Sequence, residues 1–222
     1  MGFTLLIFDC DGTLVDSEYL NNLATMRLLH DEGLTQYDMD YALKNFVGLR
    51  FKNIIASIAQ ETGHSFPTDM SERYVAMANE LMPQYLKKIS GAEELVAAAA
   101  QHGKICVASN GQRGNVITAL EMTNLKKYFN DDQIFTGTDV ANGKPAPDLF
   151  LFAANKMKTP IDECLVLEDS VAGVTAAKAA NIRVIGFTGA HKNPEHHAET
   201  LKTAGATETY DSLIHIRERL FP

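Results

Sequence analysis

The chain has 222 residues, of which 45% are hydrophobic and 22% are charged, and its net charge is −8. This length suits one domain of ordinary size with an accessory lobe, and the composition is that of a globular protein rather than of a disordered chain. The negative charge argues against a nucleic-acid partner, and no apolar run approaches the roughly 20 residues of a membrane span, so we expect no membrane association and a cytoplasmic location.

The chain opens on an apolar run, "FTLLIFD", that predicts a buried strand. Two aspartates, Asp9 and Asp11, stand at its end, and Gly12 and Thr13 follow them. Glycine lets the chain leave the strand tightly. Two carboxylates so close together repel each other, and a bound cation would stabilise them.

Helical patterns alone fill the interval from 16 to 87. A crossover between parallel strands needs about a dozen residues or somewhat more, and this interval is far longer. We therefore predict a separate helical domain at 16–87, with hinges near Val15–Asp16 and Lys87–Ser90. Residues 1–15 and 88–222 are expected to form the other domain.

Four further apolar runs follow the helical interval: "KICVASN", "DQIFTG", "CLVLED" and "IRVIGFTG". They alternate with helix-like segments, which is typical of a mostly parallel sheet with helices on both faces. Their continuous apolarity fits strands that are buried on two sides. The first of these helices shows capping-box spacing at Ser90 and Glu93 and should end at Gly103.

Polar residues collect at the ends of the predicted strands. They are Ser109 and Asn110 after the second strand, Lys144 after the third, and Glu168 and Asp169 after the fourth. Ligands of an open parallel sheet bind beyond the carboxyl ends of its strands, so we expect these groups to converge with the first aspartate pair.

A hydroxyl, an ammonium and several carboxylates at one sheet edge predict a magnesium-dependent phosphoryl-transfer site. Mg²⁺ prefers oxygen ligands. The predicted metal ligands are Asp9, Asp11, Glu168 and Asp169. Asp9 can attack phosphorus, and Asp11 can move the proton. Ser109 and Lys144 can stabilise the phosphoryl oxygens.

Further substrate contacts are predicted near the phosphate. Gly12 and Asn110 lie beside the predicted catalytic groups in the sequence, and amides after "SNGQRG" would face the same anion. Arg50 in the helical interval and Gln112, together with Lys52 and Arg113, could hold a second anionic group. A role as ordinary surface residues stays open for these four.

Four motifs in this order resemble the haloacid dehalogenase superfamily of phosphatases and phosphomutases. They read "DCDGTLVDS", "VASNG", "GKPAPDLF" and "VLEDS". The resemblance is to the capped subgroup that contains β-phosphoglucomutase, phosphoglycolate phosphatase and 6-phosphogluconate phosphatase. It implies an α/β, Rossmann-like core with strand order 3-2-1-4-5, an inserted helical cap domain, and Mg²⁺. It implies Asp9 as nucleophile, Asp11 as acid and base, Ser109 and Lys144 on the phosphate, and Glu168 and Asp169 at the metal.

The predicted function is a phosphatase that hydrolyses a small phosphorylated metabolite, a sugar phosphate or phosphorylated sugar acid, through an aspartyl-phosphate. One alternative is a β-phosphoglucomutase-like isomerase. Such mutases carry a cap histidine shortly after the first motif, whereas "DSEYLNN" has none before His30, which favours hydrolysis. A second alternative is a catalytically silent phosphate-binding protein, against which the complete motifs argue. Nothing in the sequence demands more than a monomer.

No chemical role is assigned to two further groups of residues, although a metal site stays an alternative for the first. His191, His196 and His197 lie close together in "HKNPEHH", a polar region with a proline, which favours a solvated face. The three cysteines, Cys10, Cys106 and Cys164, sit in separate apolar runs without zinc-site spacing, so we expect buried reduced thiols.

Overall fold

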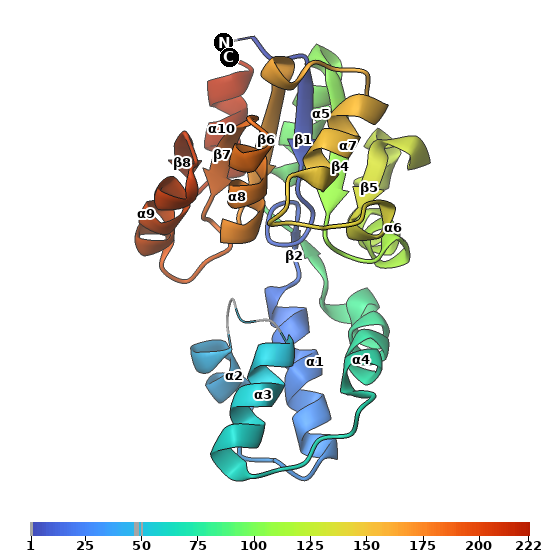
Figure 1. Ribbon diagram of the computed structural model, residues 1–222, viewed down its shortest axis with the longest axis vertical. Coiled ribbons are helices and arrows are strands. Elements are labelled where there is room, and N and C mark those ends of the chain that lie inside the picture. The colour runs from blue at the N-terminus through green and yellow to red at the C-terminus, as the bar shows by residue number, and fades with distance from the viewer. Residues whose placement is uncertain (1, 47–48, 50) are drawn as a thin grey trace. The chain divides into compact units, whose positions relative to one another are not determined.

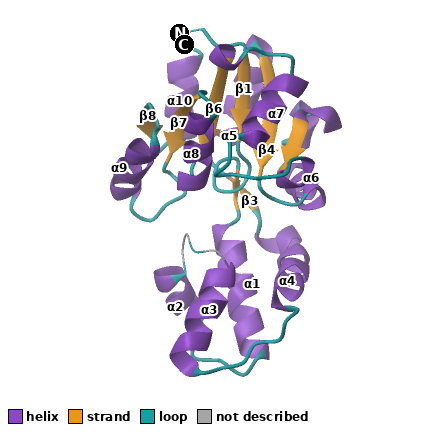
Figure 2. Cartoon of the chain, viewed as in Figure 1, coloured by secondary structure: helices purple, strands orange, loops and turns teal. Residues whose placement is uncertain are grey.

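The computed structural model describes residues 2–46, 49 and 51–222, which form two compact units. One unit comprises Met1–Asp16 and Lys87–Pro222, and the other comprises Ser17–Leu86. We call them the core unit and the helical unit. In the described residues the strands belong to the core unit (Figure 2).

The core unit is built on a six-stranded parallel sheet (Figure 1). Its strands are β1 (Leu5–Phe8), β4 (Lys104–Ser109), β5 (Ile134–Thr136), β6 (Cys164–Glu168), β7 (Arg183–Phe187) and β8 (Glu208–Tyr210). They lie in the order β5-β4-β1-β6-β7-β8. The first five strands of this sheet, numbered along the chain, therefore have the predicted order 3-2-1-4-5, and β8 adds an edge strand that was not predicted.

The register of the central strands brings the ends of three of them together. Phe8 of β1 pairs with Val107 of β4 on one side and with Leu167 of β6 on the other. Because parallel strands run in the same direction, the residues just after these pairs lie at one edge of the sheet. The catalytic candidates therefore follow at this edge.

Helices cover both faces of the sheet. They are α5 (Ala92–His102), α6 (Arg113–Met122), α7 (Asp148–Lys156), α8 (Val171–Ala179), α9 (Pro194–Ala204) and α10 (Leu213–Leu220). Helices α7 and α8 contact each other and β1, β4, β6 and β7, whereas α5 and α10 contact each other and β4 and β8. Short 3-10 turns span Lys126–Tyr128, Asp131–Gln133, Gly137–Asp139 and Ile161–Glu163.

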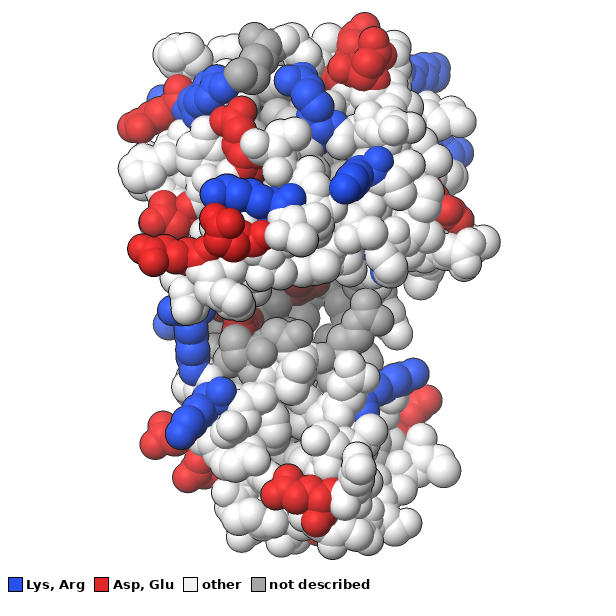
Figure 3. Space-filling model, turned by 60° about the vertical axis from the view of Figure 1, so that its left-hand side comes forward, with Lys and Arg blue, Asp and Glu red and all other residues white. Residues whose placement is uncertain are grey.

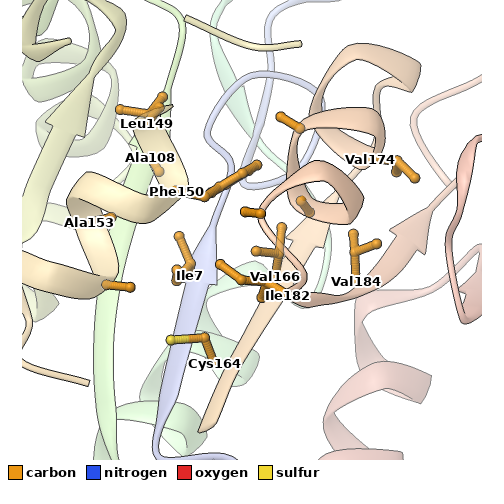
Figure 4. Packing of buried hydrophobic residues seen from close by; sticks show 14 of the residues in the cluster. Ile7, Ala108, Leu149, Phe150, Ala153, Cys164, Val166, Val174, Ile182 and Val184 are labelled. Atoms are coloured by element: carbon orange, nitrogen blue, oxygen red, sulfur yellow. The ribbon is translucent and has the colours of Figure 1, made fainter. Parts of the chain in front are cut away.

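Alternate residues of the strands face the helices. Ile7 and Val166 pack with Phe150 of α7 and Val174 of α8 in one buried cluster (Figure 4). The next residue, Phe8, belongs to the opposite face, since successive strand side chains point in opposite directions. Its ring contacts Phe129 edge to face. Strands that are covered by helices on both faces need apolar residues at successive positions, as these strands have.

The three cysteines are buried and none forms a disulfide, as predicted. Cys10 and Cys106 are fully buried, and burial raises the pKa of each thiol. The neutral thiol is therefore the stable form of both side chains.

The expected capping box of α5 is wrong. The helix begins after Gly91, whose φ is +83°, and no side chain caps it. Glu93 instead contacts Lys88 and Lys127. The helix ends at His102 before Gly103, as predicted.

The helical unit contains α1 (Glu18–Asp31), α2 (Met39–Asn45), α3 (Phe51–Thr62) and α4 (Met70–Tyr85). Helix α1 packs against α2 and α4, and α3 packs against α4. A small buried cluster holds the unit together, and its members are Leu29, Tyr37, Ala42, Phe46, Ile54 and Ile58. The unit thus has an apolar core of its own.

Two short strands of the core unit flank the sequence of the helical unit. β2 (Val15–Asp16) and β3 (Lys87–Lys88) pair antiparallel as a two-residue ribbon. Among the helices described between residues 2 and 222, none combines the length and apolarity that a membrane span requires.

Candidate active site

The loop after β1 carries the two aspartates of the first motif. The backbone N–H of Asp9 donates to the carbonyl of Leu167 at 2.9 Å, so Asp9 still belongs to the ladder between β1 and β6. Asp9 is 6% exposed, whereas Asp11 lies in the following turn and is exposed. The two carboxylates, two positions apart in the sequence, therefore lie in different environments.

The Lys144 ammonium lies between two buried carboxylates. Nζ donates to Asp9 Oδ1 at 2.5 Å and to Glu168 Oε1 at 2.6 Å, and the lysine side chain is 2% exposed. Desolvation lowers the pKa of Lys144, but Asp9 and Glu168 outweigh it, so the pKa is raised overall. Lys144 is therefore positively charged at neutral pH.

Asn110 fixes the loop that carries Lys144. Its Nδ2 donates to the Lys144 carbonyl at 2.9 Å, and its Oδ1 accepts from the Lys144 backbone N–H at 2.8 Å. Both polar atoms of this amide are thus engaged with one backbone segment. The predicted contact of Asn110 with the phosphate stays a prediction, because Nδ2 has a second N–H and Oδ1 a second lone pair.

Three acidic side chains, Asp9, Glu168 and Asp169, meet at the ends of β1 and β6. One oxygen of each lies within 4.8 Å of the others. Burial raises the pKa of Asp9 and of Asp169, and the Glu168 carboxylate raises both further against the opposing effect of Lys144. Three carboxylates face one ammonium, so a divalent cation would complete the charge balance.

The donor set fits a hard cation such as Mg²⁺, because the cluster offers oxygen atoms. Both Glu168 oxygens are already engaged: Oε1 with Lys144, and Oε2 with the N–H and hydroxyl of Ser170 at 2.8 and 2.9 Å. Asp9 and Asp169 are therefore the better candidate ligands, and Glu168 orients Lys144. Within the described residues the cluster does not include the Asp11 carboxylate.

Gly12 has no room for a side chain. Its φ is +80°, and a Cβ at this position would lie 2.2 Å from Asp169 Oδ2. The backbone at position 12 therefore lies so close to the Asp169 carboxylate that only glycine fits there. Thr13, the next residue, donates its hydroxyl to Asp169 Oδ1 at 3.3 Å.

Two histidines contact Asp169, which corrects the prediction of a solvated face. Nε2 of His191 lies 3.4 Å from Asp169 Oδ2, and Nε2 of His197 lies 2.6 Å from the Asp169 carbonyl oxygen. The two rings stack, with their centroids 3.5 Å apart. Burial lowers the pKa of His197. The third histidine, His196, is exposed as expected.

The end of β4 supplies the predicted hydroxyl. Ser109 is buried, and its Oγ accepts from the Gly111 N–H at 3.0 Å. Ser109 Oγ and Asp11 Oδ2 both lie within 4 Å of the point where a Cβ on Gly111 would stand. This hydroxyl and the exposed carboxylate are therefore near each other on one side of the strand ends.

The side chains that were predicted to bind a second anionic group of the substrate lie in different surroundings. Gln112 is exposed before α6, and its side chain does not cap that helix. Arg113 donates to the carbonyl of Ile134 at 2.6 Å and to that of Asp131, so it ties α6 to the region of β5. Arg50 lies outside the described residues.

Four residues of the site were missed at the sequence level: Thr13, Ser170, His191 and His197. Thr13 and Ser170 are direct neighbours of motif residues and could have been proposed as their hydrogen-bond partners. The histidines reach Asp169 across 22 and 28 positions of the chain, so no local pattern could reveal their contact.

Residues 6–187 match the family model of the haloacid dehalogenase-like hydrolases. The 6-phosphogluconate phosphatase of Escherichia coli K12 is 32% identical over 194 residues, which cover 86% of each chain. The validoxylamine A 7′-phosphate phosphatase of Streptomyces hygroscopicus subsp. limoneus is 33% identical over 191 residues, which cover 85% of this chain and 87% of that one.

A solved structure shows the same architecture. It is a hydrolase of the same family from Deinococcus radiodurans R1 with bound phosphate and sodium. It is 31% identical, has a TM-score of 0.80, and the match covers 99% of this chain and 95% of that chain.

Proposed function

Because the chain belongs to the haloacid dehalogenase-like hydrolases and is a phosphoric monoester hydrolase like its named relatives, we propose that it is a magnesium-dependent phosphatase that acts through an aspartyl-phosphate. The observation that carries the proposal is the buried contact of Lys144 with Asp9 and Glu168. It puts a fixed positive charge beside the carboxylate that would attack phosphorus.

In the first step, an oxygen of Asp9 bonds to phosphorus while the bond between phosphorus and the leaving oxygen breaks. Asp11, in its protonated form, donates a proton to the leaving oxygen. Asp11 is exposed, so the leaving alcohol can depart into solvent from there. An ammonium has three N–H donors, of which Lys144 uses two for carboxylates. The third and the Ser109 hydroxyl would stabilise the phosphoryl oxygens.

In the second step, water attacks the phosphorus of the aspartyl-phosphate. Asp11, now a carboxylate, takes the proton of this water, and the bond between phosphorus and Asp9 breaks. Inorganic phosphate leaves, and both aspartates return to their starting protonation states.

Asp9 and Asp169 are the residues that would hold Mg²⁺, while Glu168 keeps Lys144 in place. When bound, the ion would offset the negative charge of the phosphoryl group and of the clustered carboxylates. The Thr13 hydroxyl and the Gly12 backbone would limit the movement of the Asp169 carboxylate beside Asp9.

We further propose that the substrate is a small phosphorylated sugar or sugar acid and that the helical unit acts as the cap that selects it. The names of the two phosphatase relatives support a small hydrophilic phosphate ester. The separate hydrophobic cluster of the helical unit fits an element that moves as one piece.

The test is a phosphate-release screen over phosphorylated metabolites with Mg²⁺, comparing the parent with Asp9→Asn. We expect Asp9→Asn to lower the rate by at least about 10³-fold, because the nucleophile is lost. Asp132→Asn makes the same isosteric change at an exposed position outside the site and should keep the parent's rate. Equal rates in Asp9→Asn and the parent would overturn the mechanism.

The same assay separates hydrolysis from isomerisation. With β-glucose 1-phosphate, a phosphatase releases inorganic phosphate, whereas a mutase forms glucose 6-phosphate without releasing it. Accumulation of glucose 6-phosphate alone would replace the phosphatase proposal by the mutase alternative.

A further inference from the structure

We propose that His191 and His197 are positioning residues that hold Asp169 in the orientation needed to bind the metal. This inference rests on the proposed function, because it assigns a role toward Mg²⁺. It concerns two residues outside the four motifs that carry the family resemblance.

His197 holds the backbone of Asp169. Its Nε2 lies 2.6 Å from the Asp169 carbonyl oxygen, and a carbonyl can only accept a hydrogen bond. The proton of the neutral ring must therefore be on Nε2. His197 belongs to α9, so this bond ties the end of β6 to a helix that packs on β7 and β8.

His191 acts on the side chain of the same aspartate. It lies in the loop after β7, where its backbone N–H donates to the Thr188 carbonyl at 3.0 Å. Its Nε2 is 3.4 Å from Asp169 Oδ2, and the two side chains are 20% and 12% exposed. Thr13 contacts the other oxygen, Oδ1, so the carboxylate is restrained from both sides.

Stacking couples the two histidines. Their rings are 20° from parallel with centroids 3.5 Å apart, so the anchored ring of His197 limits the tilt of His191. Each carboxylate oxygen has two lone pairs and can accept from His191 while facing a cation. Hydrogen-bond partners of this kind orient metal ligands, and their loss typically weakens metal binding by about 10–100-fold.

The experiment measures Mg²⁺ binding to the full-length protein by isothermal titration calorimetry without substrate. His191→Phe keeps a ring that can stack on His197 but removes Nε2. We expect its dissociation constant for Mg²⁺ to rise about 10-fold. His191→Gln places an amide N–H near the position of Nε2 and should restore most of the affinity. His196→Phe is the matched control at an exposed position and should bind as the parent does.

Phosphate release separates positioning from a general structural effect. For His191→Phe, the Mg²⁺ concentration that gives half-maximal rate should rise about 10-fold, while kcat at saturating Mg²⁺ changes less than about threefold. His197→Phe should weaken Mg²⁺ binding, and His197→Gln, which keeps a donor toward the carbonyl but loses the stacked ring, should bind between His197→Phe and the parent.

The outcomes separate this inference from the proposed function. If the parent binds Mg²⁺ and releases phosphate but His191→Phe and His197→Phe bind Mg²⁺ as tightly as the parent, the positioning role is wrong and the phosphatase stands. The same conclusion follows if His191→Gln binds as weakly as His191→Phe. If the parent does not bind Mg²⁺, the metal-dependent function itself fails, and this inference fails with it.

Discussion

Two charge clusters in the core unit have the same composition with the signs exchanged, one charge between two of the opposite sign. In one, Lys144 lies between Asp9 and Glu168, and in the other, Glu93 lies between Lys88 and Lys127. The Lys144 side chain is 2% exposed, whereas the side chains around Glu93 are 27% to 45% exposed. Burial is therefore the main difference between two otherwise similar arrangements.

The buried cluster is not explained by stability. Desolvating several charges can cost more than their attraction returns, and the third carboxylate, that of Asp169, adds uncompensated negative charge. Such an arrangement is typical of a functional site. The Glu93 cluster resembles ordinary surface pairs, which contribute little and are screened by salt. Figure 3 shows acidic and basic side chains beside one another on one face of the molecule.

The largest predicted contrast comes from removing the lysines. Lys144→Met leaves two carboxylates buried without their cation, so we expect a loss of about 3–5 kcal/mol in the free energy of unfolding. Phosphate release should fall at least about 10²-fold. Lys127→Met, in the exposed cluster, should barely move the urea midpoint or the rate. Equal urea midpoints for the two variants would show that burial does not separate the clusters.

A second contrast compares two glycines with nearly equal φ. Gly12 has φ +80° and Gly33 has φ +81°, but a Cβ at Gly12 would meet Asp169 whereas nothing lies within 4 Å at Gly33. Alanine should cost about 1–2 kcal/mol of backbone strain at both positions. Only Gly12→Ala should also lower phosphate release, by about 10²-fold, because it displaces Asp169. A parent-like rate in Gly12→Ala would contradict the close approach.

The third prediction concerns pH in the buried cluster. Burial, followed by Glu168, raises the pKa of Asp169 above 3.8. A raised pKa in the folded state gives stability that is complete below the unfolded value and is lost as pH rises through the folded value. In EDTA, Asp169→Asn should therefore gain stability relative to the parent as the pH rises from about 4 toward neutral. Urea midpoints across this range measure the gain, and Mg²⁺ should reduce it by stabilising the parent. A constant difference would contradict the raised pKa.

The smallest expected effect concerns the exposed cluster, and its dependence on pH is opposite to that of Asp169. Hydrogen bonds from Lys127 and then Lys88 lower the pKa of Glu93 from 4.5 to about 2. Its stabilising effect is present above 4.5 and is lost as pH falls through the folded pKa. Glu93→Gln should therefore be slightly less stable than the parent at neutral pH, and the difference should disappear only as the pH falls below about 2. Glu94→Gln, an exposed neighbour, is the control, and the difference should shrink in high salt.

The sheet and the positions of Asp9, Ser109 and Glu168 could be predicted because they depend on short patterns. A continuous apolar run predicts a doubly covered strand, and parallel strands present their ends at one edge. β8 was missed because "ETY" is half-buried and has no apolar run. The ribbon of β2 and β3 is too short for any period to appear.

Contacts between distant segments account for side-chain partners that the sequence did not predict. Glu93 has the right spacing from Ser90 for a capping box, but two lysines compete for its carboxylate, one of them 34 positions away. Asn110 follows a strand end, as a substrate-binding residue would, yet its amide pairs with the backbone of the Lys144 loop. In both cases the local spacing was correct, and a distant partner gave the side chain a contact that the spacing could not predict.

The ribbon of β2 and β3 has a consequence for how proteins of this design can change. Val15 pairs with Lys88 and Asp16 with Lys87, so the chain enters and leaves the inserted segment at adjacent points. A segment of another length could join these points without shifting the register of β1, and each doubling of its length adds only about 0.6 kcal/mol of closure entropy. Under the proposed cap role of residues 17–86, exchanging this segment would change substrate choice while leaving the residues of the core unit in place.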